Sequence, residues 1–98
     1  MIKLVKITGQ SLYPVYQEGD FVVVSKIPFL FGSIRPGDVI VFKHPVYGLM
    51  IKRVERCVPQ TGDVYVVGTH GHSIDSRRFG AIHRDDIVGK VVWHLKKR

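Results

Sequence analysis

Cysteine, acidic residues and long apolar runs are all scarce in this chain of 98 residues. The single cysteine, Cys57, excludes an intramolecular disulfide framework. No stretch approaches the roughly 18 to 20 apolar residues of a membrane-spanning helix, and the N-terminus lacks the basic and then apolar layout of a secretory signal. The sequence as given therefore predicts a soluble chain, either cytoplasmic or peripheral to a membrane, whose stability comes from packing.

The shortage of acidic residues leaves the chain strongly basic. Lys and Arg number 15 against 8 Asp and Glu, for a formal net charge of +7. This excess indicates an anionic neighbour, which could be nucleic acid, a phospholipid surface or an acidic peptide. Charge alone does not choose among the three.

Short apolar blocks separated by turn residues dominate the remaining pattern. A chain this short supports one core, so we expect a single domain spanning 1–98. The apolar residues alternate or run in short blocks without helical spacing, which predicts strands and an all-β barrel or sandwich. The predicted strands are 2–7, 21–24, 38–42, 49–58, 63–67 and 87–95.

The segment 9–14 presents Ser11 on a loop after the first predicted strand. Gly9 lets the backbone pass close to a substrate carbonyl and Pro14 stiffens the loop, so amide N–H groups near Ser11 would be preset to face an oxyanion. A serine in a Gly/Pro turn is more often only a turn residue. A catalytic interpretation of Ser11 therefore needs a base.

Lys52 is the candidate base, because none of the five histidines lies in a recognisable triad context. Strand alternation places Lys52 on one face with Met50 and Val54, where its amine would be desolvated. Lowering a lysine pKa from about 10.4 to about 8 costs about 3 kcal/mol, which one domain can tolerate. The plainer interpretation is a lysine that extends from a strand edge into solvent.

The segment 73–80 supplies the third candidate group. Ser73 could hold and orient the lysine amine, while Asp75 and Arg77 could pair on one side of an extended loop and brace it. Taken alone, the segment is equally typical of a polar surface loop.

In their order along the chain, these segments closely resemble the conserved boxes of signal peptidase I, over about residues 7–89. The boxes are Gly9-x-Ser11-x-x-Pro14, Gly37-Asp38-x-Ile40-Val41-Phe42 followed by Pro45, Ile51-Lys52-Arg53-Val54, and Ser73-x-Asp75-Ser76-Arg77-x-Phe79-Gly80. The resemblance implies coiled antiparallel β-sheets of the signal peptidase and LexA-like type, forming a partly open barrel.

The resemblance also implies a serine endopeptidase that cleaves a signal peptide or propeptide from an extended segment of a precursor protein, after small residues. It implies Ser11 as nucleophile, Lys52 as general base, Ser73 as the lysine-orienting hydroxyl, Gly9 and Ser11 at the oxyanion, and Asp75 with Arg77 as a structural pair. No metal or organic cofactor is implied.

The sequence departs from the family pattern in several places. Leu12 stands where the family most often has Met, and Gly68-Thr69-His70 replaces a usual Gly-Asp-Asn. The transmembrane anchor and large inserted domain of many members are missing. In this the chain is similar to the short branch that includes the nickel-type superoxide dismutase maturation protease, which suggests an alternative substrate.

Two further interpretations remain. A non-catalytic basic β-barrel could bind nucleic acid through Tyr13, Tyr16 and Phe21, but the basic residues are scattered and we expect no nucleic acid partner. The three adjacent large apolar residues Phe29, Leu30 and Phe31 either cover the core or form a peripheral membrane contact.

Overall fold

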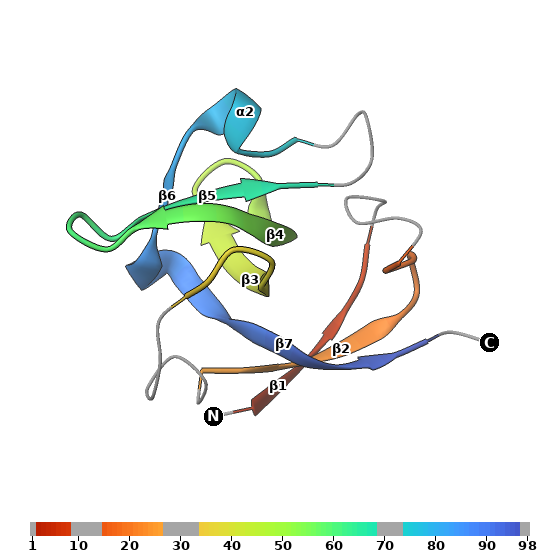
Figure 1. Cartoon of the computed structure of the whole chain (residues 1–98). Helices are drawn as coiled ribbons and strands as arrows, with labels where there is room; N and C mark the ends of the chain where they lie inside the picture. The colour runs from red at the N-terminus through yellow and green to blue at the C-terminus, as the bar shows by residue number, and fades with distance from the viewer. Residues whose placement is uncertain (1, 9–14, 27–33, 69–73, 97–98) are drawn as a thin grey trace.

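The computed structural model describes residues 2–8, 15–26, 34–68 and 74–96, which form a nearly all-β fold (Figure 1). Within these ranges no helix is long and apolar enough to cross a membrane. The elements are β1 (Ile2–Lys6), β2 (Phe21–Ser25), β3 (Val39–His44), β4 (Gly48–Val58), β5 (Asp63–Val67), α2 (Ser76–Phe79), β6 (Ile82–His83), a 3₁₀ turn η1 (Arg84–Asp86) and β7 (Ile87–Leu95).

The strands make one antiparallel sheet in the order β1-β2-β7-β3-β4-β5-β6. Strands β3, β4 and β5 follow one another as hairpins, and β7 returns to lie between β2 and β3 (Figure 1). In the part of the chain that the structure describes, no ladder joins the outer strands β1 and β6, so the sheet stays open. The prediction of an all-β, incompletely closed antiparallel fold is confirmed.

The six predicted strands match β1, β2, β3, β4, β5 and β7 to within two residues at each end. Glycine turns separate them, as at Gly48 and Gly62, whose φ angles of 74° and 77° favour a residue without a side chain. The prediction of an extended loop over 73–80 is wrong for residues 76–79, which form the single helical turn α2. A turn of four residues is too short to show a helical period.

The core consists of two groups of buried residues that meet at β3. Ile40 and Phe42 face the larger group, while Val41 faces the smaller one, so β3 is buried on both faces. The larger group is Ile40, Phe42, Val54, Val64, Val66, Ile82 and Ile87, and the smaller is Ile7, Val22, Val24 and Val41. The sheet therefore coils around its central strand, which matches the continuous apolar run of β3.

Strand β7 connects the two halves of the sheet and needs a glycine to do so. Its pairing shifts register beside Val41 and Phe42 of β3 and beside Val23 and Val24 of β2. A Cβ atom at Gly89 would lie 2.9 Å from the backbone carbonyl carbon and oxygen of Ser25. The close approach of β7 to β2 therefore requires glycine at this position.

Replacing Gly89 with alanine should destabilise the fold, because the added methyl group meets backbone that no rotamer change can move. We expect Gly89→Ala to lower the free energy of unfolding by about 1–3 kcal/mol in urea titrations. Val92→Ala, at an exposed position of the same strand, should cost only about 0.5 kcal/mol. Equal losses from the two variants would contradict this account of β7.

Candidate active site

Lys52 lies in the middle of β4, and its side chain is completely buried, with 0% of its surface exposed. It pairs with Ile40 of β3, and its strand neighbours on the same face are Met50 and Val54. Both neighbours belong to or pack against the larger core group. The face predicted from strand alternation is thus the face that the fold turns inward.

The surroundings of Lys52 disfavour its charged form. Burial lowers the pKa of the Lys52 amine below its ordinary value, the Asp75 carboxylate partly opposes this, and the Arg77 guanidinium lowers it further. The net direction is downward. A lysine in this environment becomes neutral at a lower pH than a solvated one, as a general base requires.

Asp75 is the most heavily hydrogen-bonded side chain near Lys52 and is 1% exposed. Its Oδ1 accepts from the backbone N–H and the Nε of Arg77, each at 3.0 Å. Its Oδ2 accepts from Arg77 Nη2 at 2.9 Å and from the backbone N–H of Gly68 at 3.0 Å. Asp75 therefore caps α2, pairs with an arginine and fixes the end of β5 with one carboxylate.

These contacts decide the charge of Asp75. Burial on its own would raise the pKa of the carboxyl, but the hydrogen bonds from the Arg77 side chain and from two backbone N–H groups outweigh it. The pKa of Asp75 is accordingly held below its usual range. Arg77 completes the pair from the surface, since 64% of its side chain is exposed.

Strand β5 and the β3–β4 turn hold α2 in place above β5 (Figure 1). Ser76 Oγ accepts a 2.7 Å hydrogen bond from the backbone N–H of Val66. Val66 lies past Val64, the last residue of β5 that pairs with β6. The ring of Phe79 lies 4.7 Å from that of His44. Arg53 of β4 pairs with Val67 of β5. Because the two strands are antiparallel, the residue after Val67, Gly68, lies beside the residue before Arg53, Lys52. The Asp75 carboxylate thus reaches the sheet next to the buried amine.

A groove of about 490 Å³ is lined by residues of β1 and β4. Residues 5–8 of β1 and its extension form one wall, and residues 49–51 of β4 form the other, together with Val41 and Tyr47. Among the described residues β1 pairs with β2 alone, so its outer edge faces away from the sheet. The groove therefore combines apolar side chains with an available strand edge, and its lining includes Met50 and Ile51, which precede Lys52 in β4.

Several predicted site residues fall outside the described ranges: Gly9, Ser11, Ser73 and the apolar segment 29–31. In sequence, Ser11 follows the groove residue Thr8 by three positions, and Ser73 immediately precedes Ile74. No group of three or more His, Cys, Asp or Glu that could hold a metal occurs in the ranges that the structure describes.

One buried polar cluster has no local signal in the sequence. Asp20, 3% exposed, has its Oδ2 2.7 Å from Nε2 of His94 and accepts the backbone N–H of Gln17. The His94 ring lies 4.4 Å from the ring of Tyr16, whose pKa is raised by burial and partly lowered by Arg53. His94 is 74 residues away from Asp20, beyond any local pattern.

Asp75→Asn should lower stability in a pH-dependent way. In the folded protein the Asp75 carboxyl has a lowered pKa. Its contribution to the free energy of unfolding is therefore complete above the pKa of the unfolded state, about 3.9, and is lost as the pH falls through the lower pKa of the folded state. We expect a loss of about 2–3 kcal/mol at pH 7 in urea unfolding, shrinking below about pH 4. The exposed Asp85→Asn should cost less than about 0.5 kcal/mol. A loss independent of pH would contradict an ionised Asp75.

Comparison with known proteins gives a family and one relative. Residues 2–92 match the family described as Peptidase S24-like. The chain is also similar to "Signal peptidase I V" of Bacillus subtilis (strain 168), at 39% identity over 49 residues. That alignment covers 50% of this chain and 29% of the relative, so the chain spans less than a third of that protein where they match. With the family match extending over nearly all of its strands, the chain belongs to the Peptidase S24-like family, in keeping with the signal peptidase I motifs of its sequence.

Proposed function

We propose that this protein is a serine endopeptidase in which Ser11 is the nucleophile and Lys52 the general base. The observation that carries the proposal is the complete burial of Lys52 beside the Asp75–Arg77 pair, in the strand whose residues 49–51 line the groove. A buried lysine without a chemical task is a costly feature in a small domain. Membership of a peptidase family supports the same conclusion.

The reaction follows from a neutral lysine amine. As Ser11 Oγ attacks the scissile carbonyl, the Lys52 amine takes the hydroxyl proton and becomes an ammonium group. Backbone N–H groups at Gly9 and Ser11 stabilise the oxyanion. Lys52 then donates the proton to the leaving amine. It afterwards takes a proton from the water that attacks the acyl-enzyme and returns it to Ser11 Oγ as the ester bond breaks. In this scheme the Ser73 hydroxyl orients the amine.

Asp75 and Arg77 act in this scheme as positioning residues. Four hydrogen bonds to one carboxylate fix the start of α2 against Gly68, and therefore fix the chain that directly follows Ser73. The Asp75–Arg77 ion pair also limits the electrostatic stabilisation of the Lys52 ammonium form, because the positive charge of Arg77 offsets part of the negative charge of Asp75. Both effects help to keep a neutral amine close to the serine.

The groove supports an extended peptide as substrate. A strand edge with an adjoining apolar surface can accept a peptide as an additional strand, whose alternate side chains enter the groove. A precursor segment in extended form fits this mode of binding. We further propose, from the signal peptidase I resemblance, that cleavage follows small residues and releases a signal peptide or propeptide.

The dyad is tested by removing each member. Ser11→Ala and Lys52→Met should each reduce peptide cleavage by about 10³-fold or more, and the double variant should be no worse than either single one, because the two groups act as a unit. Digestion of a peptide library with the wild type would identify the cleavage preference. Lys96→Met, at an exposed lysine, should retain activity, and circular dichroism would establish that each variant folds. Multiplicative losses in the double variant would rule out the dyad.

The pH dependence of cleavage gives a second test. A base must be neutral to work, so kcat/KM should rise with pH through one ionisation that lies below the ordinary lysine pKa of about 10.4. Lys52→Arg should be inactive, since a guanidinium stays charged at accessible pH. Asp75→Asn should move the ionisation to lower pH by removing the charge that favours the ammonium form. An ionisation that persists without Lys52 and disappears in a histidine variant would identify a different base.

A further inference from the structure

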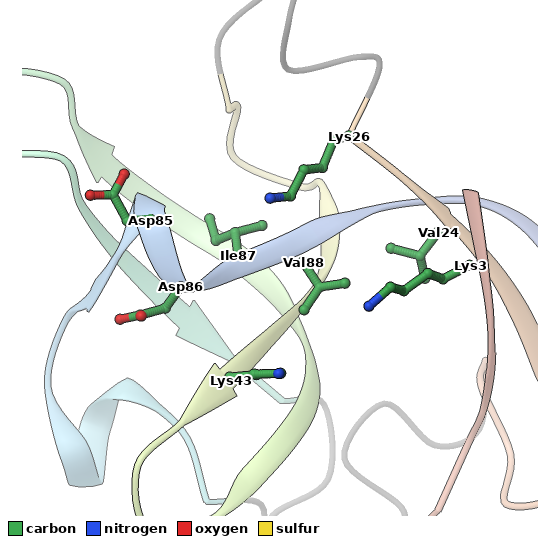
Figure 2. A pocket seen from close by; sticks show the side chains of 8 residues that line it. All are labelled: Lys3, Val24, Lys26, Lys43, Asp85, Asp86, Ile87 and Val88. Atoms are coloured by element: carbon green, nitrogen blue, oxygen red, sulfur yellow. The ribbon is translucent and has the colours of Figure 1, made fainter. Parts of the chain in front are cut away.

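A second hollow lies at another place on the fold and shares no residue with the groove (Figure 2). Its volume is about 270 Å³. Three lysines line it, together with two acidic residues and an apolar floor. They are Lys3, Lys26 and Lys43, Asp85 and Asp86, and Val24, Ile87 and Val88. We call this hollow the lysine pocket.

The three lysines come from separate parts of the sheet. Lys3 lies on β1, Lys26 directly follows β2, and Lys43 lies on β3. Figure 2 shows the Lys3 and Lys43 side chains extending toward the floor from different strands, with Lys26 reaching over Ile87. Three ammonium groups that line one hollow repel one another unless an anion lies between them.

The acidic residues of the lysine pocket form no ion pair with its lysines. In Figure 2 the carboxylates of Asp85 and Asp86 point away from the ammonium groups. Asp85 Oδ2 instead lies 3.3 Å from Nδ1 of His83. Across the described ranges, none of the ion pairs includes Lys3, Lys26 or Lys43.

We propose that the lysine pocket binds a small anion that carries a phosphate group. Lysine is a point-charge binder of phosphate, and a phosphate near pH 7 carries about twice the charge of a carboxylate, so it attracts each ammonium group more strongly. The volume is at the small end for ligand sites and suits a single anionic group. The apolar floor of Val24, Ile87 and Val88 weakens solvent screening along one side.

The test uses the whole chain and inorganic phosphate, titrated at constant ionic strength with chloride as the reference anion. Binding should saturate and shift the amide resonances of Lys3, Lys43 and Val88 in NMR spectra. Lys3→Gln and Lys43→Gln should each weaken binding about threefold or more. Lys96→Gln removes the same charge from an exposed lysine outside the pocket and should leave binding unchanged. Lys43→Gln should also leave the cleavage of a soluble peptide unchanged, which separates this proposal from the peptidase mechanism.

A second arm distinguishes a free phosphate from a lipid headgroup. If the ligand is a headgroup, vesicles containing phosphatidic acid should sediment the wild type but not the triple variant Lys3→Gln, Lys26→Gln, Lys43→Gln. Inorganic phosphate should compete with the vesicles. If the ligand is a free phosphate, the three substitutions should weaken the binding of inorganic phosphate but leave the binding of the protein to the vesicles unchanged. The proposal is overturned if phosphate fails to saturate, or if Lys96→Gln weakens both kinds of binding as much as the pocket variants do.

Discussion

The burial of one lysine amine is the constraint on which the rest of the structure depends. Lys52 occupies a core position of β4, between apolar neighbours and opposite Ile40, where a charged group is strongly disfavoured. A domain of this size tolerates such a residue only if its surroundings are held rigidly. Asp75 provides that rigidity, because its carboxylate joins α2, the end of β5 and Arg77 through four hydrogen bonds.

Charge at this site is balanced between two requirements. A carboxylate facing Lys52 alone would stabilise the ammonium form and impair a base. Without any negative charge, the positive charge of Arg77 would act on Lys52 unopposed. Because both oxygens of Asp75 are bound by Arg77 and by backbone N–H groups, its effect on Lys52 is reduced while its own pKa stays low. Asp75 can bind both the backbone and the side chain of Arg77 because the two residues are only two positions apart and Asp75 caps α2, the turn that carries Arg77.

Local patterns predicted the strands and the inward face of Lys52 because alternation and turn glycines act over only a few residues. They do not show where the chain departs from regular alternation or where partners are distant. Cys57 is an example of such a departure: an extra residue at Glu55 shifts the register of β4 against β5, and Cys57 packs against the larger core group, where its thiol donates to the Ile34 carbonyl. The Asp20–His94 pair was equally hidden, because only the folded sheet brings β7 beside the turn before β2.

Strand β1 gives both the groove and the lysine pocket one of their walls. Lys3 near its start lines the lysine pocket, and residues 5–8 at its far end line the groove. Only β2 holds this strand in the described part of the sheet, through five pairs from Ile2↔Ser25 to Lys6↔Phe21. Beyond them the Ile7 backbone continues the pairing with Gly19 and Asp20, and the carboxylate of Asp20 is bound by His94 of β7. The buried Asp20–His94 pair therefore does more than stabilise a turn: it ties the groove-lining end of β1 to the long strand that joins the two halves of the sheet.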